Sequence, residues 1–409
     1  MSNLGSNKPA LTVLETVCAV LPLSPPADNW STIDWYSKKI CGIPFLMRNI
    51  INIQRAGINS LIIYSKTDNT ALRKRLSQEK KITLKLIFET DISEVIKATK
   101  DISVVILNSE ALHTKQEIKS GMDFINNSNE ELVYPISSKI AAETLTQITL
   151  GNEVTFTQVP DDQNPHINFL PGKKNSHIKK PEDFLIQQEK LIQGSGLSND
   201  SLMDRSVTRF FSRRLTKLFL KTALSPNMIT ILSLFIGLIS AIFFFQGSYK
   251  TNMTGATLLL LSAWVDCTDG EIARLKFLES KIGAKLDIIC DNLVHFSVFF
   301  AIGMGLYQST GNNIFMLLGF LAVFGSFVSF LFLSSSIIDN KKIVSTNTTD
   351  LEKKKTLTDN LANRDFIYFL FFMSLIGRVD IFICITAFGA NIFAFYLSYL
   401  KIKSTLCIS

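Results

Sequence analysis

The chain has 409 residues, of which 47% are hydrophobic, and a formal net charge of +7. This length allows two or three domains. The six cysteines include no Cys-x-x-Cys pair and have no histidine at ligand spacing, so we expect them to be reduced and structural. A positive charge suits nucleic acid or an anionic membrane surface. Because the basic residues lie next to long apolar segments, we expect a membrane and no nucleic-acid partner.

Residues 1–175 alternate short β-branched runs with segments of helical period. Such alternation is typical of a parallel sheet with helices on its faces. The sequence therefore predicts a soluble, doubly wound α/β domain. Strands are expected at 12–23, 60–64, 84–88 and 104–107, and helices at 44–56, 70–81 and 92–99.

The order of these elements resembles the sugar-phosphate nucleotidyltransferase fold, with residues 42–44 opening a helix and 56–58 preceding the second strand. In that family a glycine-rich loop after the first strand, ending in Arg and followed by Lys, binds the nucleotide phosphates. Here residues 21–27 contain no glycine and no basic residue, and their three prolines lack backbone donors. The resemblance therefore implies a domain that has lost nucleotidyl transfer and binds a ligand, contacts a partner or acts as a scaffold.

Residues 176–224 are expected to form a linker and an amphipathic helix. A helix is predicted from 181 to 191, a break at 194–196, and a second helix from 201 to 221. Aromatic side chains of the second helix would face lipid and its cations the headgroups, while a helix packed between domains is the alternative. The cations are Arg205, Arg209, Arg213, Arg214, Lys217 and Lys221.

Residues 225–409 contain six apolar segments, each near the ~20 residues that cross a bilayer. The segments are 227–246, 252–273, 284–307, 312–338, 362–379 and 380–401. Lysines and arginines gather at 274–285 and 341–364, and no charge occurs at 307–313. The positive-inside rule then places the N-terminal domain in the cytoplasm. We predict an all-α, multi-pass membrane domain with six transmembrane helices, whose glycines at helix contacts favour a homodimer.

Four aspartates lie at the ends of the second and third of these segments: Asp266, Asp269, Asp287 and Asp291. Within each pair the spacing of three or four residues places both side chains on one helix face. Ionisable groups in membrane segments mark functional sites, and like charges repel unless cations lie between them. The oxygen donors suit two divalent ions, Mg²⁺ or Mn²⁺, whereas solvated helix ends are the alternative.

The aspartates belong to the pattern D-x2-D-G-x2-A-R-x8-G-x3-D-x3-D. Its remaining members are Gly270, Ala273, Arg274 and Gly283. The pattern is the signature of the CDP-alcohol phosphotransferases, which the chain resembles from about residue 201 to its C-terminus. The resemblance implies an integral membrane enzyme that transfers a substituted phosphate from a CDP-linked donor to an acceptor hydroxyl and releases CMP. It further implies that the aspartates hold the metals and that Asp291 is the general base.

The other motif residues are expected to bind the substrate. Gly270, Ala273 and Gly283 are small enough for a nucleotide or a neighbouring helix to approach the backbone. Arg274 could bind a phosphate through two N–H groups, although a membrane-surface anchor is the alternative. Asn227 follows a proline before the first apolar segment, as in the family, and is assigned to the nucleotide site by that resemblance.

Two substrate classes fit this resemblance. One pairs a lipid donor such as CDP-diacylglycerol with a polar acceptor in phospholipid synthesis. The other pairs CDP-inositol with inositol phosphate, because the domain order resembles the bifunctional inositol-phosphate cytidylyltransferase and di-inositol-phosphate phosphate synthase. A transport or scaffold protein that binds divalent cations without transferase activity is the alternative from another functional class.

Overall fold

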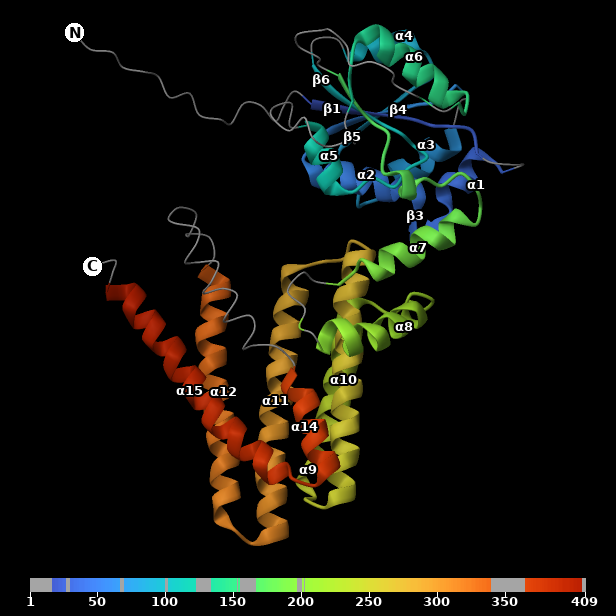
Figure 1. The fold of residues 1–409 in the computed structure, drawn as a ribbon. Coiled ribbons are helices and arrows are strands. Elements are labelled where there is room, and N and C mark those ends of the chain that lie inside the picture. The colour runs from blue at the N-terminus through green and yellow to red at the C-terminus, as the bar shows by residue number, and fades with distance from the viewer. Residues whose placement is uncertain are drawn as a thin grey trace, which may run out of the picture. The chain divides into compact units, whose positions relative to one another are not determined.

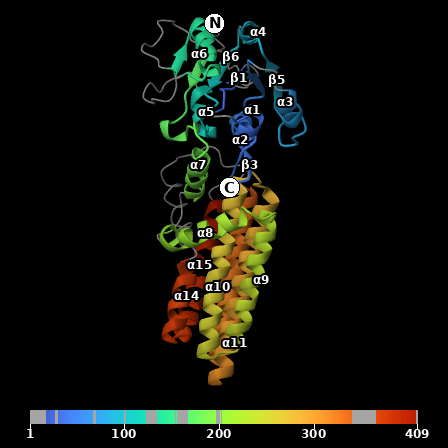
Figure 2. The same cartoon turned by 90° about the vertical axis from the view of Figure 1, so that its right-hand side faces the viewer.

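The chain forms two compact units, Met1–Lys190 and Leu191–Ser409. The structure, a computed structural model, describes residues 17–26, 30–66, 70–99, 102–122, 134–152, 154, 167–196, 201, 203–339 and 365–406. Figures 1 and 2 draw both units from two sides. The domain boundaries predicted at residues 175 and 224 stay predictions.

The first unit is built on a six-stranded sheet with the strand order β5-β4-β1-β6-β8-β7. All neighbouring strands are parallel except β7 and β8. The strands are β1 (Val17–Pro22), β4 (Ser60–Tyr64), β5 (Lys85–Glu89), β6 (Ser103–Leu107), β7 (Tyr134–Ile136) and β8 (Ile167–Leu170). A predominantly parallel α/β architecture is thereby confirmed, while positions 12–16 of the first predicted strand lie outside the described residues.

Helices cover both faces of this sheet. In Figure 1, α4 and α6 lie on one face and α2 and α5 on the other. These helices are α2 (Phe45–Ala56), α4 (Ile92–Ala98), α5 (Lys115–Met122) and α6 (Ser138–Thr149). The unit also contains α1 (Thr32–Ser37), the hairpin β2 (Lys39–Ile40) and β3 (Ile43–Pro44), α3 (Thr70–Ser77) and the 3₁₀ turn η1 (Lys174–Ser176); α7 (Asp183–Gln193) runs across the boundary. Gly57 ends α2 in the left-handed conformation that glycine favours (φ 104°).

Three side chains fill the space at the carboxyl ends of β1 and β6. The Tyr36 ring is 1% exposed, and its hydroxyl lies 3.1 Å from the Oγ atoms of both Ser24 and Ser109. The Ser24 N–H donates to Ser109 Oγ at 3.1 Å, and burial raises the pKa of the Tyr36 phenol to about 12. Ligands of open α/β sheets bind where the connections from neighbouring strands diverge. In this sheet that place, between β1 and β6, is occupied by the protein itself.

The second unit contains helices at all six positions predicted to cross the membrane. They are α9 (Pro226–Phe245), α10 (Tyr249–Leu275), α11 (Lys281–Thr310), α12 (Asn313–Asp339), α14 (Asp365–Ile376) and α15 (Val379–Leu406). Within the described residues, only α9, α11, α12 and α15 are long and apolar enough to span. Helix α10 carries three acids near its C-terminal end, and the twelve residues of α14 extend about 18 Å against the ~30 Å of a bilayer core. The prediction of six spans is therefore not confirmed.

Close approaches between glycines bring the helices together. Helix α9 packs along both α10 and α11 (Figure 2). A Cβ atom on Gly303 of α11 would lie 2.7 Å from the Cα of Gly319 on α12, and one on Gly325 would lie 2.8 Å from the backbone of Ala390 on α15. The predicted packing role of these glycines is confirmed, but their contacts are within the chain. They consequently give no support to a homodimer, which stays a prediction.

Stability of the first unit is expected to depend on pH through His113. This imidazole is 1% exposed, and burial lowers its pKa below the ordinary value of 6.5. Below pH 6.5 the unfolded chain therefore binds a proton that the folded domain does not, and stability is lost as the pH falls. We expect the unfolding temperature of this unit to drop as the pH is lowered from 7.5 to 5.5. The measurement is the temperature at which a protease begins to cleave within residues 103–122. His113→Gln should flatten this dependence, and a variant with the same pH dependence as the wild-type protein would contradict the assignment.

Candidate active site

Three of the four motif aspartates converge. Asp266 and Asp269 extend from α10 and Asp287 from α11, and one carboxylate oxygen of each lies within 4.8 Å of the other two. Asp266 and Asp269 are only 3% and 8% exposed. Three carboxylates this close repel one another unless a cation lies between them. An all-oxygen donor set is the kind that Mg²⁺ and Mn²⁺ prefer, so these residues fit a divalent metal site.

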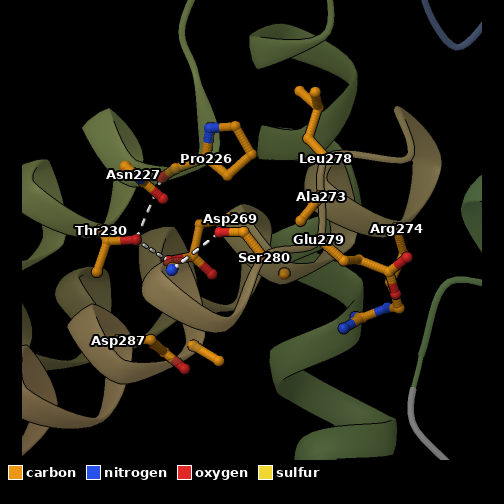
Figure 3. Close-up of a pocket in the computed structure, with 13 residues that line it drawn as sticks. Pro226, Asn227, Thr230, Asp269, Ala273, Arg274, Leu278, Glu279, Ser280 and Asp287 are labelled. Carbon is orange, nitrogen blue, oxygen red and sulfur yellow. Dashed lines mark hydrogen bonds between the residues drawn. The ribbon is translucent and has the colours of Figure 1, made fainter. Parts of the chain in front are cut away.

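Hydroxyl groups of α9 hold two of these carboxylates. Thr230 Oγ1 donates to Asp269 Oδ2, and Figure 3 shows the two side chains pointing toward one another. Ser233 Oγ lies 3.2 Å from Asp266 Oδ1. Such outer partners fix the orientation of metal ligands. Neither residue was among the predicted site residues, although two hydroxyls three positions apart on a largely apolar helix were a signal.

The aspartate cluster (Asp266, Asp269 and Asp287) borders a pocket of about 290 Å³ at one end of α9, α10 and α11. Its wall includes Asp269, Asp287 and every residue predicted to bind substrate: Asn227, Gly270, Ala273, Arg274 and Gly283. A Cβ atom on Gly283 would lie 3.0 Å from Asn227 Oδ1, and one on Gly270 would lie 3.1 Å from Arg274 Nη1. Larger residues at these two positions would therefore crowd the wall.

Arg274 lines this pocket, and a main-chain carbonyl fixes the position of its side chain. Its Nε donates to the backbone carbonyl of Ser195 at 2.9 Å. Figure 3 shows its guanidinium beside the carboxylate of Glu279, another residue of the pocket wall. The structure thus places Arg274 in the pocket wall, and its role as a phosphate ligand or as a membrane-surface anchor stays a prediction.

Asp291 lies one helical turn beyond Asp287. Among the described residues, the group able to hold an ion consists of the three other aspartates. Asp291 lines a separate, much smaller cavity of about 20 Å³, together with Asp266 and His295. Its roles as fourth ligand and as general base stay predictions.

A buried ion pair ties α8 (Arg209–Phe219) to the helix that carries the site. Glu271 of α10 is 0% exposed and accepts hydrogen bonds from Arg209 Nη1 at 2.8 Å, Ser212 Oγ at 2.7 Å and Thr216 Oγ1 at 2.6 Å. These donors are spaced along one face of α8, directly after the π-helical turn η2 (Asp204–Thr208). Glu271 is adjacent to Gly270 in the pocket wall, so the contact braces α10 at the site.

This pairing corrects the expectation for the amphipathic helix. Arg209 was expected to face lipid headgroups but is buried, because Glu271 offers it a charged partner inside the bundle. Phe211 also turns inward and stacks on Trp264 of α10, with ring centroids 3.9 Å apart. Phe210 and Leu218 remain exposed on the face of α8 that points away from α10, the side that the prediction assigned to lipid.

Comparison with known proteins agrees with this geometry. Residues 223–396 match the family model described as CDP-alcohol phosphatidyltransferase, which confirms the resemblance for this part of the chain. A bifunctional IPC transferase and DIPP synthase of Aquifex aeolicus is 26% identical over 197 residues, 48% of this chain and 43% of that protein. The corresponding protein of Archaeoglobus fulgidus is 33% identical over 184 residues, 44% of this chain and 34% of that protein. The chain thus matches less than half the length of these two relatives.

A solved structure is similar to part of this chain. The Mycobacterium tuberculosis phosphatidylinositol phosphate synthase PgsA1 with CDP-DAG bound is 15% identical, with a TM-score of 0.37. The match covers 47% of this chain and 92% of that chain.

Removing one partner of the buried pair should destabilise the second unit. Glu271→Leu leaves the Arg209 guanidinium buried without its carboxylate, which typically costs about 3–5 kcal/mol. We expect a clear drop in the thermal unfolding temperature of the detergent-solubilised protein. The double variant Arg209→Met/Glu271→Leu should lose less than the sum of its single variants, and Lys221→Met, an exposed change beyond α8, should have no effect. Additive losses would show that the two side chains do not interact.

Proposed function

We propose that this chain is an integral membrane CDP-alcohol phosphotransferase that transfers a substituted phosphate from a CDP-linked donor to an acceptor hydroxyl. The observation that carries the proposal is the placement of Asp266, Asp269 and Asp287 within 4.8 Å of one another beside a pocket that also contains Arg274. The match of residues 223–396 to the family supports the same reaction.

Each part of the site has a defined task in this reaction. Two Mg²⁺ or Mn²⁺ ions held by the aspartates would neutralise the charge on the two phosphates of the donor. Arg274 binds a phosphate oxygen, and Asn227 borders the space left by the two glycines for the nucleotide. Asp291 accepts the proton of the acceptor hydroxyl. The acceptor oxygen then bonds to the phosphorus that carries the substituent, and the bond from that phosphorus to the oxygen of the CMP phosphate breaks.

The α/β unit has the domain position of a nucleotidyltransferase but does not transfer nucleotides in this proposal. Its first strand leads into the proline-containing loop after Pro22, which lacks glycines and cations. The side chains of Ser24, Tyr36 and Ser109 occupy the region where a nucleotide would bind between β1 and β6. In this proposal the protein therefore does not make its own CDP-linked donor, and the membrane site receives the donor from another source.

Substrate and topology are the finer parts of the proposal. The bifunctional relatives favour a polar donor such as CDP-inositol, and a lipid donor such as CDP-diacylglycerol is the second candidate. Lys276, Lys281 and Lys285 flank the pocket between α10 and α11, which supports a cytoplasmic site by the positive-inside rule. Six spans, with α10 and α14 completing the bundle, and a homodimer belong to the same proposal.

Asp291→Asn should separate chemistry from metal binding. Without a carboxylate base, CMP release from a panel of CDP-alcohols and acceptors should fall at least about 100-fold. Mn²⁺ affinity, measured by calorimetric titration, should change little, whereas Asp269→Asn should lose both activity and Mn²⁺ binding. Full turnover by the Asp291 variant would remove it as the base. A wild-type protein that binds Mn²⁺ but releases no CMP would favour the transport or scaffold alternative.

The full chain should not make its own CDP-linked donor. We expect no pyrophosphate release and no CDP-alcohol when the protein is incubated with CTP, Mg²⁺ and inositol phosphate or other polyol phosphates, because the loop after β1 offers few phosphate-binding groups. The products are identified by mass spectrometry. Pyrophosphate released faster than without protein would contradict the assignment of the α/β unit.

A further inference from the structure

We propose that His295 is a positioning residue, which holds the Asp291 carboxylate toward the acceptor hydroxyl through one water molecule in the cavity that both residues line. The inference rests on the proposed function, since it assigns a partner to the base of that reaction. Nothing in the motif points to this histidine, because it lies beyond the last motif aspartate.

The first support is the cavity itself. It measures about 20 Å³ and lies where α9, α10, α11 and α14 meet. About 10–15 Å³ is enough to hold one water, provided that two to four polar groups surround it. The residues that line this cavity include Asp266, Asp291, His295, Ser233 and Ser262. It is thus large enough for a single water and too small for a substrate.

The second support is the register of α11. Asp287, Asp291 and His295 follow one another at intervals of four residues, so they share one face of the helix. Asp287 lines the substrate pocket, and Asp291 and His295 line the small cavity. The face therefore leads from Asp287 in the aspartate cluster to the imidazole of His295 in two helical turns, and Asp291 lies between them.

The third support is the immobilisation of the imidazole. Its ring meets the Phe366 ring of α14 edge-on, with centroids 4.9 Å apart and planes at 81°. On the side of its own helix it lies near Phe299, with centroids 6.3 Å apart and planes at 20°. The Phe299 and Phe366 rings are themselves 5.9 Å apart, so the imidazole packs against one side of an aromatic pair, a contact that restricts its rotation as a positioning role requires.

A purely structural role is the competing explanation. Polar side chains inside membrane bundles are costly and rare unless they act in function or join helices. If His295 served only as packing, an aromatic ring of similar shape would replace it, and a hydrogen-bonding replacement would bring no advantage. The two explanations therefore predict opposite rankings of the Phe and Gln variants.

The test compares variants of the full-length protein in steady-state assays of CMP release. His295→Phe should lower kcat about 10- to 100-fold, the usual cost of losing an outer partner, without changing KM for the CDP-linked donor. His295→Gln should recover part of the lost kcat. Phe366→Leu should lower kcat moderately, and adding it to His295→Phe should cause no further loss because both changes act on the same ring.

Phe296→Leu is the matched control. This residue neighbours His295 on α11 but packs against Phe327 and Phe330 of α12, with centroids 5.9 and 6.4 Å apart, so its variant should keep the wild-type kcat. Wild-type kcat in His295→Phe, a His295→Gln variant no better than His295→Phe, or an equal loss in Phe296→Leu would each overturn the inference. Absence of CMP release from the wild-type protein would instead overturn the proposed function, and the inference with it.

Discussion

The structure depends on stabilising negative charge inside an apolar helix bundle. Helix α10 carries acids on two of its faces within six residues, and the negative charge on each face is stabilised in a different way. Glu271 receives a guanidinium and two hydroxyls from α8, so its charge is balanced within the chain. Asp266 and Asp269 accept hydrogen bonds from hydroxyls of α9 and lie beside Asp287, a grouping of carboxylates that fits a divalent cation. One helix thus carries both a carboxylate paired with a guanidinium and two carboxylates that fit a metal site.

Much of the architecture could be predicted because it is encoded locally. The predicted segments 60–64 and 104–107 coincide with β4 and β6 to within one residue, and the fixed spacing of the motif placed Asp266, Asp269 and Asp287 on facing helices. Antiparallel β7 and its neighbour β8 were missed, because three- and four-residue strands carry too little alternation. Two of the six expected spans stay unconfirmed within the described residues, because α10 carries three acids and α14 has only twelve residues.

Side-chain contacts between residues far apart in the sequence could not be predicted from sequence patterns. Arg209 has the spacing of a surface cation, and only the buried Glu271 sixty-two positions later changes that interpretation. Tyr36 follows the first strand by more than a dozen residues, and nothing in its neighbours indicates that it packs between Ser24 and Ser109. The absence of glycines and cations after the first strand was readable from the sequence, but the position of the Tyr36 side chain at this end of the sheet was not.

The contact between Arg274 and Ser195 has a consequence for how this protein can change during evolution. The acceptor is a main-chain carbonyl, which every amino acid provides. Replacing the side chain at position 195 therefore leaves the acceptor in place, whereas adding or deleting a residue between the end of α7 and position 195 would shift it away from the guanidinium. Position 195 is thus tolerant of side-chain changes but fixed in its distance from α7, a signature to look for when related genes are compared.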